Sequence, residues 1–340
     1  MRSPRPSRNL KPARRKGLPL PFRFPWQRCR ARSDICAPRL AARPRRRPPP
    51  PLRRHWRARS SLYFGRMHRN AISGRRKACA GRSGLAAMRR IEYVTRLLCT
   101  GLSFAFFGIG GLLLSLTAFP LMNLFVRDRA RRAHYAQWLV QKAFRLHVLF
   151  MTAFGVIRVE VRGGDALASD TGTLVVANHP TLIDVVLLMS VMRRTQCIVK
   201  AQLWRNPFMR GVIAAAGYIR NDDQPEKLID DCAAVLAEGN NLVVFPEGSR
   251  TVPGAPVKFQ RGAANIALKA RAPIRPVTIS CEPPTLKKGQ KWYEIPATRA
   301  VFTIAVGSLI EIDSFIEDAN QSKAARRLNS RLSEVLVGGK

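Results

Sequence analysis

Hydrophobic and polar positions divide the chain into three parts. Before residue 88 the sequence shows no sustained hydrophobic periodicity, whereas residues 97–126 carry no charge at all. Beyond them, short runs of β-branched residues alternate with stretches of helical period. We therefore expect a disordered leader over 1–87, a membrane-inserted segment with an amphipathic helix over 88–160, and a globular domain over 161–340.

Charge sharpens the boundary of the leader. It holds 26 of the 59 Lys and Arg, twelve of the 24 prolines and one acid, Asp34. Such a stretch cannot bury enough apolar surface to offset its ordering entropy. Two interpretations stay open: a polybasic arm for anionic lipid or nucleic acid, and a translated upstream stretch whose native start is Met88. The abrupt change in composition favours the second.

The uncharged run over 97–126 is long enough for a membrane helix. Its 30 residues would span about 45 Å, against a hydrocarbon core of about 30 Å. Gly108, Gly110 and Gly111 interrupt it near the middle, and arginines flank both ends. Under the positive-inside rule both ends prefer the cytoplasm. A single tilted span remains an alternative, but the pattern favours a hairpin or re-entrant insertion.

A second helix is expected over 134–157. Gln137, Gln141 and Arg145 recur at a helical spacing and leave the rest of the surface apolar. This helix could lie in the membrane interface or pack on the globular domain.

The globular part alternates strands with helices. Strands are expected over 173–178, 196–200, 218–220, 241–245 and 273–280, with helices between them, short strands near 301–312 and a terminal helix over 321–335. This order predicts an α/β fold with a largely parallel central sheet flanked by helices. Functional groups should then gather in the loops that follow the carboxyl ends of the strands.

One such loop is ANHPTLID. His179 follows a strand directly, and Asp184 comes five positions later at the start of a helix. The carboxylate can then accept a hydrogen bond from Nδ1 and leave Nε2 facing a cleft as a base, a geometry that suits deprotonation of an alcohol. A helix-capping Asp beside a turn histidine explains the spacing equally well.

The second loop is VVFPEGSRT, which places Glu247, Gly248, Ser249 and Arg250 after an apolar strand. Gly248 permits close approach of the backbone, and Arg250 offers a planar fork that suits a phosphate. These parts indicate an anion site, although a surface turn would use the same residues.

Taken together, the two loops resemble the motifs of the phospholipid/glycerol acyltransferase family, whose best-known members are lysophosphatidic acid acyltransferases. The segments around Lys200, Gly217, Lys258 and Ala272 resemble further blocks of that family. The resemblance implies a glycerolipid acyltransferase-like domain behind an N-terminal membrane helix or hairpin.

The family resemblance also implies a reaction. His179 would be the general base and Asp184 its orienting carboxylate. Asn178, Glu247, Gly248, Ser249 and Arg250 would bind the substrate, with Arg250 on a phosphate and Glu247 holding either the acceptor hydroxyl or that arginine. The acceptor hydroxyl of a lysophospholipid, most simply 1-acylglycerol-3-phosphate, would attack an acyl thioester.

The second block departs from the family. Many members have an arginine where this chain has Asp223, and Arg220 lies three positions earlier. If Arg220 does not replace that cation, a non-phosphatidic acceptor, such as a lyso-ornithine lipid or a specialised polyene lipid, becomes more plausible.

The remaining expectations concern cofactors, partners and localisation. We expect no metal and no cofactor, with acyl-carrier protein or acyl-CoA as the co-substrate donor and membrane lipids as partners. The catalytic domain would lie on the cytoplasmic face of a membrane, the inner membrane in a bacterium. A non-catalytic protein that binds anionic membrane or nucleic acid is the alternative of another class, and nucleic acid is not the expected partner.

Overall fold

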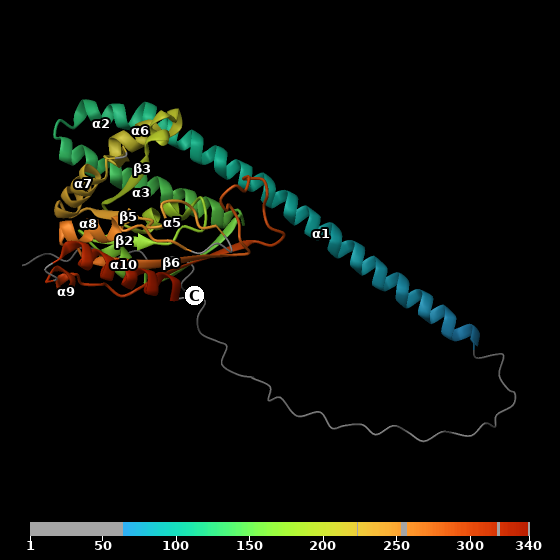
Figure 1. Ribbon diagram of the computed structural model, residues 1–340. Coiled ribbons are helices and arrows are strands. Elements are labelled where there is room, and N and C mark those ends of the chain that lie inside the picture. Colours follow the sequence, from blue (N-terminus) through green and yellow to red (C-terminus); the bar gives the residue numbers. More distant parts are fainter. Residues whose placement is uncertain (1–63, 223, 253–256, 318–319, 339–340) are drawn as a thin grey trace, which may run out of the picture. The chain divides into compact units, whose positions relative to one another are not determined.

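A seven-stranded sheet forms the centre of the domain (Figure 1), in a computed structural model that describes residues 64–340 except 223, 253–256, 318–319 and 339–340. The strand order is β1-β7-β6-β2-β5-β3-β4. Neighbouring strands are parallel except for β6 and β7. The expected largely parallel α/β fold is confirmed. The strands are β1 (Ile157–Arg162), β2 (Leu174–Ala177), β3 (Thr195–Lys200), β4 (Ile219–Asn221), β5 (Asn241–Val244), β6 (Ile274–Glu282) and β7 (Ala300–Val306).

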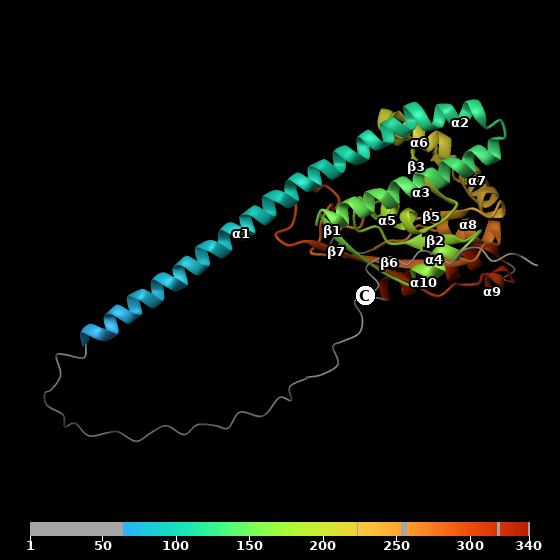
Figure 2. The ribbon, with the colours of Figure 1, turned by 180° about the vertical axis from the view of Figure 1, so that it is seen from behind.

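Helices cover both faces of the sheet, because alternate residues of the inner strands point to opposite faces. In β2, Leu174 and Val176 join a core with α7, α8 and α10, whereas Val175 and Ala177 join a core with α5. Figures 1 and 2 show these two layers. The α-helices that follow β1 along the chain are α4 (Gly164–Ser169), α5 (Asp184–Val191), α6 (Pro207–Ala216), α7 (Pro225–Ala237), α8 (Gly262–Ala270), α9 (Asp313–Ile316) and α10 (Gln321–Gly338).

The domain begins earlier than the hydrophobic pattern indicated. The helix expected to continue to residue 157 is α3 (Arg129–Ala153), and Gly155, with φ +72°, follows its end. The chain then forms β1, which pairs with β7. In β1 the half-buried Val159 and Val161 alternate with charged residues, so this edge strand lacks the continuous apolar run of the central ones.

α3 packs on the domain. The face that it buries includes one of the polar residues that were expected to form its polar side. Gln137 was expected on the solvent side, but it is buried and its Nε2 donates to Ala216 O at 3.3 Å. Val140, Phe144 and Met151 are buried on the same side. The amide can be buried because a free carbonyl at the end of α6 accepts its hydrogen bond.

The apolar run is one continuous helical path, and the hairpin expected at its glycines is wrong. α1 (Phe64–Leu113) continues through a π-helical turn (Leu114–Ala118) into α2 (Phe119–Phe125), and the path enters α3 only after residues 126–128. Gly111 serves close packing, whereas a Cβ on Gly108 or Gly110 would meet nothing within 4 Å. A Cβ on Gly111 would lie 3.0 Å from Phe208 O, and one on Gly211 of α6 would lie 2.5 Å from Ser115 Cβ.

Part of the leader is helical. Residues 1–63 lie outside the described residues, so the disorder expected there stays a prediction. Residues 64–87, expected to be disordered as well, form the first turns of α1. All twelve leader prolines precede residue 52, so none of them interrupts the hydrogen bonds of this helix.

The apolar helix has its polar side inward. Arg96, Thr100 and Ser103 are buried at a helical spacing, whereas Leu98 and Leu102 are exposed. Among the described residues one helical stretch, 87–125, is long and apolar enough to cross a membrane, with a mean hydropathy of 2.0 and 11 % of its most apolar window buried. Such a distribution is the reverse of that of a water-facing helix.

Candidate functional site

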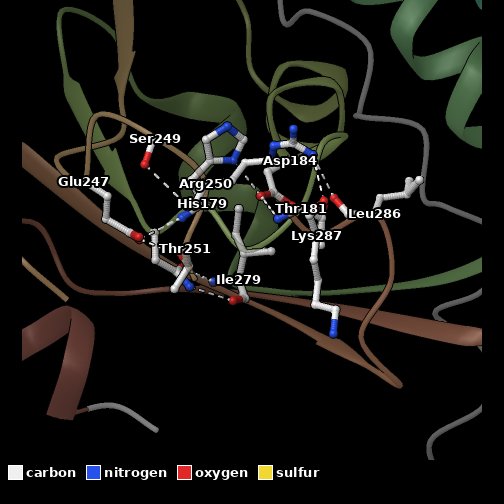
Figure 3. Close-up of polar contacts among 11 residues, drawn as sticks. His179, Thr181, Asp184, Glu247, Ser249, Arg250, Thr251, Ile279, Leu286 and Lys287 are labelled. Carbon is white, nitrogen blue, oxygen red and sulfur yellow. Dashed lines mark hydrogen bonds and ion pairs between the residues drawn. The ribbon is translucent and has the colours of Figure 1, made fainter. Parts of the chain in front are cut away.

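The two loops with motif residues lie side by side. ANHPTLID follows β2 and VVFPEGSRT follows β5, and these two strands are parallel neighbours in the sheet. Their carboxyl ends therefore bring His179 and Glu247 to the same edge, although 68 positions separate them. Figure 3 shows both residues within one network of polar contacts.

His179 is held by a buried carboxylate. Its Nδ1 lies 2.8 Å from Oδ2 of Asp184, which is fully buried in the first turn of α5. Thr181 donates to the same carboxylate from its backbone N–H, at 2.7 Å, and from its hydroxyl. The ring of Phe245 stacks on the imidazole at 4.2 Å. With Nδ1 occupied, Nε2 is the ring nitrogen that remains for chemistry.

Glu247 joins the two loops. Its Oε1 accepts from the backbone N–H of His179 at 3.1 Å and from the hydroxyl of Thr251 at 3.0 Å. Thr251 N–H in turn donates to His179 O at 2.7 Å. The interpretation that Glu247 holds Arg250 is not what the structure shows, because neither carboxylate oxygen bonds that arginine among the described residues. Glu247 instead fixes the backbone that carries the histidine.

Asn178 fixes the same loop from the other side. Its Nδ2 donates to Ile279 O at 2.8 Å, and its Oδ1 accepts from Ile279 N at 2.6 Å. Both ends of the amide are thus used by β6, and Asn178 is not part of the cavity wall beside His179. Its place is that of a clamp on the loop, rather than that of the substrate contact that was expected.

A cavity of about 710 Å³ lies beside His179. Apolar residues of α3, α5, α6, β3 and the end of α1 form most of its wall. Gly248, Ser249 and Arg250 line it, and Gly248 has φ +66°, which favours glycine. Lys200 and Lys288 add two more cationic side chains.

Arg250 is anchored in place. Its Nη1 donates to Leu286 O at 3.2 Å and to Lys287 O at 3.0 Å, which leaves the other nitrogens of the fork for a ligand. Lys288 Nζ lies 3.5 Å from Ser249 Oγ. The motif loop and the segment after β6 thus bring two cations to one rim of the cavity.

Arg220 is not brought to this cavity. Its guanidinium pairs with Asp222 and lies over the ring of Trp204 at 6.0 Å. It lines a separate hollow next to α7 instead. A β-strand alternates its side chains, so Arg220 points away from its neighbour Asn221, which does line the His179 cavity.

Several residues of the site carried no sequence signal. Thr181 and Thr251 act through hydrogen bonds that only the fold brings together, and Lys288 sits in an irregular segment far along the chain. Phe245 was visible as the last apolar residue of a strand, but nothing in its spacing predicted the stack on His179.

Other reactive groups near the histidine are not activated. Cys197 lines the cavity, and burial raises the pKa of its thiol to about 12, so it stays protonated at neutral pH. Within the described ranges, no three His, Cys, Asp or Glu side chains come together as a metal site.

Comparisons with known proteins find acyltransferases. Residues 158–280 match the model of the acyltransferase family. Curated relatives include the chloroplastic 1-acyl-sn-glycerol-3-phosphate acyltransferase BAT2 of Brassica napus, 25 % identical over 49 % of this chain and 48 % of its own length. The human 1-acyl-sn-glycerol-3-phosphate acyltransferase alpha is 32 % identical over 41 % of this chain and 51 % of its own length. The chain thus spans about half the length of these relatives.

A solved structure shares the fold. The 1-acyl-sn-glycerophosphate acyltransferase PlsC of Thermotoga maritima superimposes with a TM-score of 0.54 at 21 % identity, over 73 % of this chain and 97 % of that one. The family model, which matches residues 158–280, and the curated relatives confirm the resemblance to the phospholipid/glycerol acyltransferase family that the two loops carried.

Proposed function

We propose that this protein is a membrane-bound O-acyltransferase that moves a fatty acyl group from an acyl thioester to a hydroxyl of a lysophospholipid, most simply 1-acylglycerol-3-phosphate. The observation that carries the proposal is the His179–Asp184 pair, with 2.8 Å between Nδ1 and Oδ2, beside a large apolar cavity with a cationic rim. The names of the relatives support the same acceptor.

His179 acts as the general base in this reaction. The Nδ1–H donates to Asp184, so Nε2 carries a lone pair and takes the proton of the acceptor hydroxyl. The oxygen attacks the thioester carbonyl, the C–S bond breaks, and the imidazolium returns the proton to the departing sulfur. The fully buried Asp184 fixes the tautomer and stabilises the imidazolium.

The cationic rim binds the acceptor phosphate. Arg250 keeps free donors after its two carbonyl contacts, and Lys200 and Lys288 line the same cavity. These side chains supply positive charge in a chain that has Asp223 in place of the arginine of many family members. Since phosphate contacts from a guanidinium can be bidentate, Arg250 is the main ligand.

The outward apolar side of α1 and α2 holds the domain at the membrane. Leu98, Leu102, Leu116 and Leu124 are exposed, while the polar Thr100 faces the domain. Lipid is the solvent that favours this arrangement. We propose the cytoplasmic face for the catalytic domain, which the arginines that follow α2 favour under the positive-inside rule.

Acyl transfer by membranes that contain the full chain tests the proposal. Labelled acyl-carrier protein or acyl-CoA is offered with lysophosphatidic acid, and product formation is compared between the parent, His179→Ala and His134→Ala. The first substitution removes the base and lowers the rate by about 10²–10⁴ or more. The second removes a histidine of α3 that lies outside the cavity wall and retains the parental rate.

The acceptor is tested separately from the chemistry. Arg220 pairs with Asp222 away from His179, an observation that favours a non-phosphatidic acceptor as the second candidate. A His179-dependent product from total lipid extract, but not from lysophosphatidic acid, supports that acceptor class. If neither source gives a His179-dependent product, the protein is not an acyltransferase of this kind.

A further inference from the structure

The wall of the His179 cavity contains polar side chains that the proposed reaction does not use. Thr100 and Ser103 of α1 and His147 of α3 line it, and all three are at most 6 % exposed. They lie on the two helices, whereas the cationic rim comes from loops of the sheet.

His147 is an unusual residue for such a position. It is 5 % exposed, and its Nδ1 has no hydrogen-bond partner among the described residues. Phe106 and Phe107 flank its ring, with centroids at 6.1 and 5.1 Å. A buried polar atom without a partner costs about 1–3 kcal/mol, and apolar residues of similar size would pack without that cost.

The charge state of His147 narrows the choice of ligand. Burial lowers the pKa of its imidazole to about 4, so the ring is neutral at pH 7 and offers one donor and one acceptor. Ser103 offers a second hydroxyl on the buried part of the cavity wall, whereas Thr100 already donates to Arg96 O at 2.7 Å. A neutral group that can both donate and accept fits these side chains better than an anion does.

We propose that this end of the cavity binds a hydroxyl group on an acyl chain, with His147 and Ser103 as the residues that determine this specificity. The inference rests on the proposed acyl transfer and adds the class of chain: a hydroxylated fatty acyl group, carried either by the thioester donor or by the acceptor lipid. The rest of the wall is apolar and receives the hydrocarbon.

Competition between matched substrates tests the proposal in the full chain. Hexadecanoyl thioesters that differ only in the presence and position of one hydroxyl are compared with an unsubstituted lysophosphatidic acid as acceptor. A second arm places the same hydroxyls on the acyl chain of the acceptor and keeps the donor unsubstituted. The arm that shows a preference identifies the source of the chain.

The parent is expected to use at least one hydroxylated isomer with a kcat/KM about three- to tenfold above that of the unsubstituted chain, the effect of one hydrogen bond. Ser103→Ala and His147→Phe each bring this ratio toward one. Tyr218→Phe is the comparison variant, because it removes another buried and unpartnered polar atom from the same wall. A parental ratio in that variant assigns the preference to Ser103 and His147.

Two results overturn the inference. One is a parental ratio at or below one for every isomer in both arms. The other is a preference that survives both Ser103→Ala and His147→Phe, or that only Tyr218→Phe abolishes. Transfer of unsubstituted chains without a hydroxyl preference rejects this inference alone, whereas no transfer from any donor rejects the proposed function as well.

Thermal stabilisation gives a readout that does not depend on turnover. Free hydroxylated hexadecanoic acid should raise the Tm of the solubilised parent more than the unsubstituted acid does. The difference should vanish in Ser103→Ala, a substitution small enough to leave the packing of α1 intact. An equal difference in parent and variant contradicts the role of Ser103.

Discussion

His179 and His147 line the same cavity in opposite surroundings. His179 has a buried carboxylate on Nδ1 and cations nearby, whereas Nδ1 of His147 has no partner among the described residues and aromatic rings on its sides. In the proposed reaction the first imidazole takes a proton from the acceptor, whereas burial keeps the second one neutral at pH 7. What a histidine can do follows from the groups around it.

The largest expected effect on the difference between the two histidines comes from removal of the charge on Asp184. Asp184→Asn leaves the shape of the side chain but presents an amide to Nδ1, so the ring no longer keeps the tautomer with its lone pair on Nε2. We expect acyl transfer to fall by about 10²–10⁴. Steady-state rates of the variant check this, with its Tm as a control for folding; a loss below tenfold contradicts the orienting role.

The second prediction concerns stability and pH at His147. An unfolded imidazole binds a proton below its ordinary pKa of 6.5, but the folded one does so only below about 4. Stability is therefore full above pH 6.5 and falls as the pH drops toward 4, by about 3 kcal/mol for a shift of this size.

Denaturation of the solubilised protein between pH 7 and pH 4 measures this effect. His147→Phe should lose less stability over that range than the parent, while His134→Ala, at a site outside the cavity wall, should follow the parent. Parallel curves for parent and His147→Phe would show that another group controls the acid limb.

The smallest expected effect is on acceptor binding at the rim. Arg250→Ala should raise KM for a phosphorylated acceptor about ten- to hundredfold, the loss of one or two charge-assisted hydrogen bonds. KM for an unphosphorylated acceptor should change much less. Lys288→Ala serves for comparison, because an exposed lysine contributes less; equal changes of KM for both acceptors in Arg250→Ala remove Arg250 from the phosphate role.

The sequence predicted the elements near the site better than the faces they bury. β2 and β5 were expected close to their observed bounds, because buried parallel strands appear as short apolar runs in the sequence. The helix after His179 begins at Asp184, as its sequence predicted. Gln137 was assigned to the wrong side of α3, since its partner, Ala216 O, comes from a distant helix. No local rule reports such a contact.

In the candidate site, too, some contacts could be predicted from local spacing and others could not. His179 and Asp184 lie five positions apart, so the short turn that precedes α5 explains their contact. The contacts of Glu247 with His179 and of Asn178 with Ile279 depend on strand order in the sheet, which spacing along the chain does not encode. Gly111 of α1 showed the same limit, because its close approach to α6 depends on a partner far along the chain.

The anchoring of the histidine loop has a consequence for the order of events during synthesis. Asn178 bonds to Ile279, 101 positions later, so the loop leaves the ribosome long before its last anchor exists. At about 5–20 residues per second, that interval lasts about 5–20 s. The apolar helix over 87–125 leaves the ribosome before both residues. Under the proposed membrane anchoring, the pocket would therefore take shape only after the nascent chain has been tethered.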